Sequence, residues 1–210
     1  DGRDLTWKFV KYNYKKLLTF FTEKEDRSPA QLAQYAVAAY DEEYRELLAD
    51  YTQSAINLEN FSSCETAISA FASYAQQLMQ EEHKYCKFIK KIRRNDELTT
   101  EFCDWDYIDA IHFFQSVKLK SGAKAEKKEK KLHKSLESQK LKELAILAER
   151  VEEKIRTHIL ANASGINLPN AHGLSIYFPE KNIHKSYPKT TFAKESSWLD
   201  FLKAYFKKKK

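Results

Sequence analysis

The sequence predicts a mainly α fold with a few short strands, an α/β fragment, and two observations carry this prediction. The chain of 210 residues contains only 4 Gly and 4 Pro, too few for the tight turns that an all-β protein needs about every 8 to 12 residues. At the same time, 42% of the residues are hydrophobic and 13% are aromatic, which is enough to bury a core in one domain or one and a fraction. We therefore expect long helices around a buried core.

Apolar residues at helical spacing place the expected helices. They cover residues 5–21, 29–48, 61–93, a short segment ending at 114, 141–159 and 198–205. Several have recognisable start signals: Ser28 with Pro29 and Gln31 forms a capping box, Asn60 precedes the third helix, Asp104 or Asp106 precedes the short one, and Ser196 or Ser197 precedes the last. The third helix is expected to be interrupted around residues 80–83.

Two segments are typical of strands. Residues 51–58 break the helical period and carry few strong helix formers. Residues 173–178 are β-branched and aromatic and lie between a glycine and a proline. A short apolar strand must pair to satisfy its backbone groups, so we expect 52–57 and 173–178 to lie in one small sheet with an open edge. The chain is expected to divide into residues 1–60 and 61–210.

The excess of positive charge is concentrated in two lysine-rich runs. The formal net charge is +6, and most of it comes from residues 124–134 and 207–210. Such runs are compatible with binding to nucleic acid, acidic protein or anionic lipid, but a solvated helix face or a tail is the commoner explanation. The stretch 118–136 is poor in large apolar residues, so it is interpreted as an exposed helix extension or a flexible insertion.

Nothing in the sequence predicts a membrane span, because no apolar run approaches the ~18 residues that one requires. No charged-then-apolar leader is present at the amino end either. The chain begins at Asp1, so the missing leader carries no information about compartment.

The three cysteines, Cys64, Cys86 and Cys103, match neither a zinc site nor a disulfide scaffold. On one helix, Cys64 and Cys86 lie roughly 33 Å apart at about 1.5 Å per residue and cannot meet. Free, mostly buried thiols are expected.

The sequence contains two possible nucleophile–base arrangements, and neither has the features of a catalytic pair. His172 precedes Gly173, as in the His-Gly pair of caspase-type peptidases, but it precedes a strand instead of closing one and no cysteine follows it. Cys103 has His112 nearby in sequence, but the surrounding carboxylates favour the unreactive thiol. Those carboxylates are Glu101, Asp104, Asp106 and Asp109. They lack the spacing and glycine of a calcium loop, so helix capping is the preferred interpretation. We therefore name no catalytic residue, no cofactor-binding residue and no metal ligand, and no cofactor is expected.

Four segments in order along the chain resemble the clostripain family of cysteine endopeptidases, which belongs to the caspase-like clan. These are ADYTQSAINLENF (49–61), FCDWDYIDAIHFFQSV (102–117), AHGLSIYFP (171–179) and SSWLDFLKAY (196–205). The third is similar to the family's GLSIYFP strand and is the most specific. The resemblance covers residues 28–207, with 118–136 divergent.

The resemblance implies that this chain is the helical carboxy-terminal part of a caspase-like α/β peptidase. Residues 1–60 would contribute to the catalytic-domain scaffold, and 61–210 would form a mostly helical carboxy-terminal domain. The parent would cleave after basic residues with a His–Cys dyad that lies upstream of this chain, so the partners implied are the upstream catalytic part and a peptide or protein substrate. Neither nucleic acid nor a membrane span is expected, and the family favours an exported bacterial protein.

A different class of function stays open. A stand-alone or degenerate helical interaction module would use its basic segment to bind an acidic partner, nucleic acid or a membrane surface.

Overall fold

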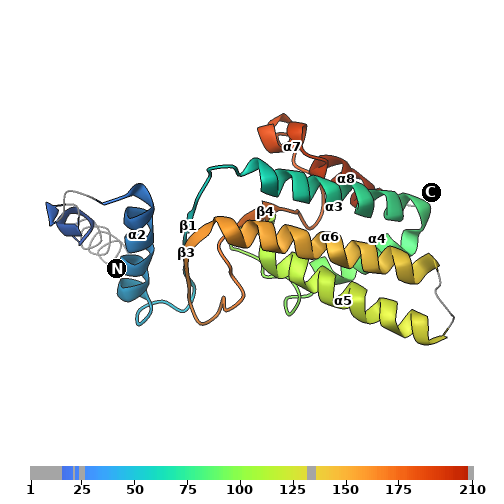
Figure 1. Ribbon diagram of the computed structural model, residues 1–210, viewed down its shortest axis with the longest axis horizontal. Coiled ribbons are helices and arrows are strands. Elements are labelled where there is room, and N and C mark those ends of the chain that lie inside the picture. The colour runs from blue at the N-terminus through green and yellow to red at the C-terminus, as the bar shows by residue number, and fades with distance from the viewer. Residues whose placement is uncertain (1–15, 21, 24–26, 132–135, 208–210) are drawn as a thin grey trace. The chain divides into compact units, whose positions relative to one another are not determined.

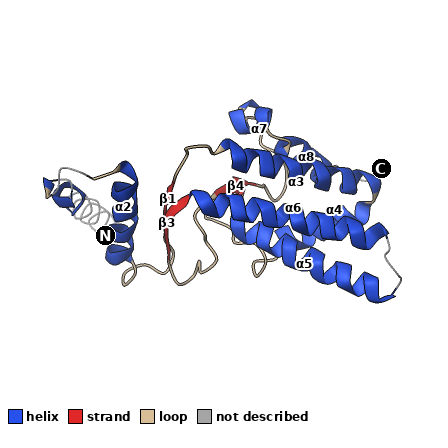
Figure 2. Cartoon of the chain, viewed as in Figure 1, coloured by secondary structure: helices blue, strands red, loops and turns tan. Residues whose placement is uncertain are grey.

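The structure, a computed structural model, describes residues 16–20, 22–23, 27–131 and 136–207. It is mainly helical, with two small two-stranded sheets (Figures 1 and 2). Its elements are α2 (Pro29–Tyr44), β1 (Thr52–Ile56), α3 (Ser62–Glu81), α4 (His83–Arg93), β2 (Tyr107–Asp109), α5 (Ala110–Lys131), α6 (Leu136–His158), β3 (Ile159–Ser164), β4 (Ser175–Tyr177), the 3-10 turn η1 (Tyr187–Lys189), α7 (Thr191–Glu195) and α8 (Trp198–Phe206). None of the described helices is long and apolar enough to cross a membrane.

The chain forms two compact units. One comprises residues 1–58 and 158–174, and the other comprises 59–157 and 175–210. We call them the strand unit and the helical unit. Most of the helix expected over 5–21 lies outside the described residues. Its described part, residues 16–20, is helical.

In the strand unit, α2 begins at the expected capping box. The Gln31 backbone N–H donates to Ser28 Oγ at 3.2 Å, and the Ser28 N–H donates to Gln31 Oε1 at 2.9 Å. Strand β1 pairs antiparallel with β3, with Thr52 opposite Ser164. Gly165 allows the chain to turn tightly after β3, because a Cβ there would lie 2.2 Å from the Ala49 carbonyl oxygen.

The β1–β3 pairing corrects two predictions. The helix predicted to reach residue 159 ends at His158, and the chain continues as strand β3, which the sequence did not predict. The expected pairing of 52–57 with 173–178 is wrong as well, since β4 pairs with β2 in a separate sheet. Both misses have one cause: β2 and β3 are short and carry no sequence alternation strong enough to outweigh a neighbouring helical pattern. Residues 158–174, grouped by sequence with 61–210, belong to the strand unit.

The helical unit packs around a cluster of aromatic rings. Trp198, 0% exposed, stacks on Phe201 at 4.6 Å between ring centroids. Phe178, just after β4, makes an edge contact with Trp198 at 5.7 Å. Phe71 of α3 and Phe114 of α5 contribute further edge contacts to the same cluster. As predicted, Trp198, Phe201, Leu202 and Tyr205 are all buried.

A buried arginine joins three segments of the helical unit. Arg93, 1% exposed at the end of α4, donates from Nε to the Phe178 carbonyl and from Nη2 to the Trp105 carbonyl, both at 2.8 Å. Its Nη1 pairs with the Glu101 carboxylate. The guanidinium thereby supplies donors to backbone carbonyls next to β4 and β2 that burial would otherwise leave unsatisfied.

Helix starts differ from the sequence predictions in two places. Asn60 has a positive φ of 56° and α3 begins after Phe61 without a side-chain cap, so Asn60 does not cap it. Asp109 replaces Asp104 and Asp106 as the residue at the start of α5, because its Oδ1 accepts the His112 backbone N–H at 2.8 Å. The expected interruption of the third helix is confirmed, with a break at Glu82 between α3 and α4.

The lysine-rich stretch 118–136 is helical over its described part and is not a simple exposed extension. Ser121 and Ala125 of α5 are fully buried, and Ser138 of α6 donates to the Ala125 carbonyl at 3.2 Å. Small side chains allow α5 and α6 to approach closely here, which a search for large apolar residues misses.

Candidate functional site

The residues weighed as possible nucleophiles and bases do not form a catalytic pair in the described structure. Cys103 is an exposed free thiol, while Cys64 and Cys86 are buried and free. His112 is buried and its Nδ1 accepts the Thr100 N–H at 3.1 Å, with Thr100 Oγ1 at 2.8 Å from the same nitrogen. Burial lowers the pKa of His112, so its imidazole is neutral at pH 7. His172 lies half-buried in the loop between β3 and β4.

The carboxylates around Cys103 serve local structure. Asp104 Oδ1 accepts the Asp106 N–H at 3.2 Å, Asp109 caps α5, and Glu101 pairs with Arg93. Across the residues that the structure describes, no group of three or more His, Cys, Asp or Glu side chains could hold a metal ion.

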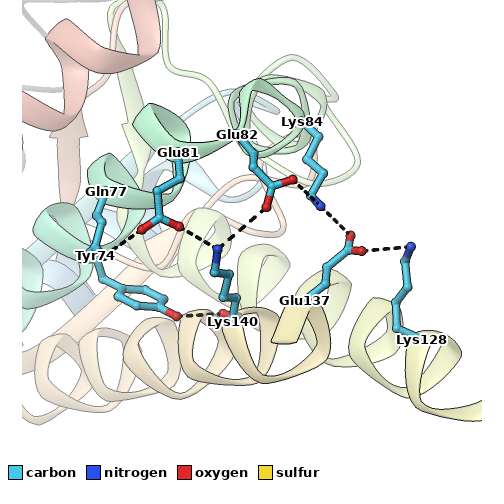
Figure 3. A network of polar contacts seen from close by, with 8 residues as sticks. All are labelled: Tyr74, Gln77, Glu81, Glu82, Lys84, Lys128, Glu137 and Lys140. Atoms are coloured by element: carbon cyan, nitrogen blue, oxygen red, sulfur yellow. Dashed lines mark hydrogen bonds and ion pairs between the residues drawn. The ribbon is translucent and has the colours of Figure 1, made fainter. Parts of the chain in front are cut away.

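A network of lysines and glutamates joins helices of the helical unit, and it includes Lys128 of the lysine-rich stretch. Figure 3 shows Lys84, Lys128 and Lys140 interleaved with glutamates of α3, α6 and the turn before α4. Lys140 lies 2.6 Å from Glu81, and Lys128 lies 3.0 Å from Glu137. Hydrogen bonds from Lys140 and Gln77 lower the pKa of Glu81.

A second set of ion pairs joins α5 to α6. Lys118 lies 2.8 Å from Glu152, which also accepts from Gln115 and Arg156. Burial raises the pKa of Glu152, but these hydrogen bonds outweigh it and hold the pKa below its ordinary value. Lys118 and Lys128 of the lysine-rich stretch therefore connect α5 to α6, whereas Lys120 and Lys127 are exposed.

Cations on α4 are arranged differently. Helix α4 carries a row of four exposed cations at helical spacing, which are Lys87, Lys90, Lys91 and Arg94. Among the described residues none of them makes an ion pair with a carboxylate. Lys87, Lys90 and Arg94 line two adjoining depressions, each with a volume of about 380 Å³, and Lys91 lines only the shallower one.

We call the deeper depression the basic groove. Its wall opposite α4 consists of the segment after β4 and the end of α8. The lining residues are His83, Cys86, Lys87, Lys90, Arg94, Glu180, Lys181, Tyr205, Phe206 and Lys207. Five of these carry a fixed positive charge and one, Glu180, a negative charge.

Two of the residues that line the basic groove, Cys86 and Tyr205, are buried. Tyr205 is 3% exposed, and the Cys86 thiol donates to its carbonyl at 3.4 Å. Burial raises the pKa of Tyr205 to about 12 despite the nearby positive charges of Arg94 and Arg93, so its phenol is neutral. The hydroxyl is buried, and its proton has no acceptor among the described residues.

Sequence reasoning missed this site because it searched for runs of lysine. The cations of the groove come from three separated segments, and only Lys207 belongs to a run. The spacing of Lys87, Lys90, Lys91 and Arg94 was visible in the sequence but is also that of an ordinary solvated helix face. The nearby carboxylates that would neutralise such a face can be identified only in three dimensions.

Comparison with models of known protein families, with curated proteins and with solved structures finds no match to this chain.

Proposed function

We propose that this chain is the carboxy-terminal scaffold part of a clostripain-like cysteine endopeptidase. In this proposal the His–Cys dyad lies in another part of the protein, and the strand unit adds to the sheet that carries it. The sequence resemblance motivates the proposal. The structural observation that supports it is the incomplete β1–β3 sheet.

Within the described residues β1 pairs only with β3, so each strand has an edge with no strand partner. Such edges are normally covered, charged or paired, because they otherwise recruit other strands. Two strands alone are marginally stable in water. An additional strand on either edge would satisfy the free backbone groups of that edge.

The strand unit also has a small core and several exposed large apolar side chains. Its buried core residues are Val37, Tyr51, Ala55 and Ala163. By contrast, Leu58 is 73% exposed and Ile166 is 83% exposed, and Leu47 and Leu48 are exposed as well. Under the proposal, another part of the protein covers these side chains.

Under this proposal, the isolated chain does not hydrolyse peptides ending in Arg or Lys, and an arginine-directed active-site electrophile does not label it. The longer protein that contains this chain hydrolyses them. Fluorogenic arginyl peptides measure both, with mass spectrometry to detect labelling of cysteine. Substrate-protected labelling of Cys64, Cys86 or Cys103 in the isolated chain, or an inactive longer protein without a His-Gly and an Asp-Ala-Cys segment, contradicts the proposal.

The alternative function is a stand-alone helical interaction module. The sequence suggested that the lysine-rich stretch would bind the partner, but the structure favours the basic groove. Lys118 and Lys128 of the lysine-rich stretch are engaged in ion pairs. The basic groove on α4 is the observation that favours a binding role.

A further inference from the structure

We propose that the basic groove binds an acidic peptide segment, that is, a short extended stretch of another protein that presents several Asp or Glu carboxylates. The inference depends on the helical unit alone. It does not depend on the proposed peptidase role, so the two can fail separately.

The exposed lysines of α4 have no carboxylate partner among the described residues. Three half-buried lysines elsewhere on the helical unit lie against glutamates, as Figure 3 shows for Lys84, Lys128 and Lys140. The described residues provide no such partner for Lys87, Lys90 or Lys91. Several like charges placed together raise the local positive potential, and a complementary anionic ligand relieves their mutual repulsion.

The row of cations on α4 is too long for a single small anion to contact both ends. Lys87 and Arg94 are seven residues apart on α4, which corresponds to about 10 Å along the helix axis. A single small anion cannot contact cations at both ends of such a row. An extended peptide advances about 3.3 Å per residue and turns alternate side chains to the same side, so three or four residues with alternating carboxylates match it.

The shape and polarity of the basic groove favour a peptide over a nucleic acid or a membrane surface. Nucleic-acid sites without sequence preference offer exposed aromatic rings for stacking, whereas Tyr205 is buried and Phe206 is only partly exposed. Interfacial membrane binding requires apolar side chains that protrude beside the cations, whereas Cys86 and Tyr205 in the groove are buried and Phe206 is half-buried. A peptide chain fits a depression of this kind.

The Tyr205 hydroxyl is a further group that a peptide ligand would satisfy. The Tyr205 hydroxyl is a buried donor without an acceptor, a condition that is uncommon in folded proteins. A carboxylate or carbonyl oxygen held beside Arg94 would provide that acceptor after a small side-chain movement.

The experiment measures binding of the full 210-residue chain to a fluorescein-labelled eight-residue peptide of alternating Glu and Ser, by fluorescence anisotropy at low and at physiological salt. The same peptide with Gln in place of Glu is the ligand control. The test variant is Lys87→Gln, Lys90→Gln and Lys181→Gln together, which removes three charges that line the groove. The control variant is Lys120→Gln, Lys127→Gln and Lys194→Gln, which removes the same charge from exposed lysines of α5 and α7 that have no ion-pair partner among the described side chains.

We expect the Glu peptide to bind and the Gln peptide not to bind. The affinity of the test variant should be about tenfold weaker or more, and that of the control variant within about twofold of the parent chain, since each exposed ion pair contributes modestly and three are removed. Unchanged thermal unfolding of both variants excludes misfolding as the cause.

Three results overturn the proposal. One is the absence of peptide binding at low salt. Another is equal weakening in the two variants, which would indicate a diffuse effect of net charge. The last is binding of a dT oligonucleotide or of phosphatidylserine vesicles, but not of the peptide, with sensitivity to the groove substitutions.

Discussion

Replacing Arg93 with Ala is expected to destabilise the helical unit by about 3–5 kcal/mol, because removing one partner of a buried charge pair leaves the other buried groups unsatisfied. The carbonyls of Phe178 and Trp105 lose donors that lie at 2.8 Å, and the Glu101 carboxylate loses its cation. The midpoint of thermal unfolding should fall by roughly 10 °C, at about 2–4 °C per kcal/mol for a protein of this size.

The matched control for Arg93 is Lys91→Ala. Lys91 lies two residues earlier on the same helix and is exposed, so this substitution should change stability by less than about 0.5 kcal/mol. The variant Arg93→Lys separates charge from geometry: an ammonium cannot reproduce the planar fork of donors, so most of the loss should remain. Circular dichroism melts measure all three variants. Full stability of Arg93→Lys would show that the positive charge alone matters.

Replacing Trp198 with Ala is the second large effect that we expect, at about 3–5 kcal/mol. The side chain is fully buried, and its Nε1 donates to the Tyr177 carbonyl at 2.7 Å. Truncation therefore removes ring contacts with Phe178 and Phe201 and leaves a buried carbonyl of β4 without its donor.

Trp105→Ala is the control for the tryptophan prediction, because the same side chain is 65% exposed there. The Trp105 backbone carbonyl still accepts from Arg93 in this variant, so only the exposed ring is lost. Chemical denaturation monitored by circular dichroism should place Trp105→Ala close to the parent chain and Trp198→Ala several kcal/mol below it. Similar losses in both variants would mean that the core does not depend on Trp198 as described.

The comparison of sequence with structure shows which signals are local. The capping box at Ser28 and the apolar face of α8 depend on residues close together in the chain, and both are confirmed. Strand β3 was missed because ILANAS continues the apolar pattern of α6, and only pairing with β1 makes it a strand. Pairing partners are distant in sequence, so the alternation within a short segment cannot identify them.

Arg93 illustrates a signal that was present but not used. The buried residues of α4 are Tyr85, Cys86, Ile89, Ile92 and Arg93, which all lie on one face. The helical period therefore places this arginine on the apolar face, where a charged side chain is found only when it is paired. Its partners, two backbone carbonyls and Glu101, could not be predicted, because they depend on the position of β4 and of the loop before β2.

Under the proposed scaffold role, another part of the protein pairs with the edges of β1 and β3, whereas α3 and α8 pack against each other within the helical unit of this chain. Hydrogen–deuterium exchange of the isolated chain, followed by mass spectrometry, tests this most directly, because amide protection reports local opening. We expect the amides of α3 and α8 to exchange at least about tenfold more slowly than those of β1 and β3, and β1 and β3 to become protected in the longer protein that contains this chain. Equal protection of the two units in the isolated chain, with no change in the longer protein, would contradict the account.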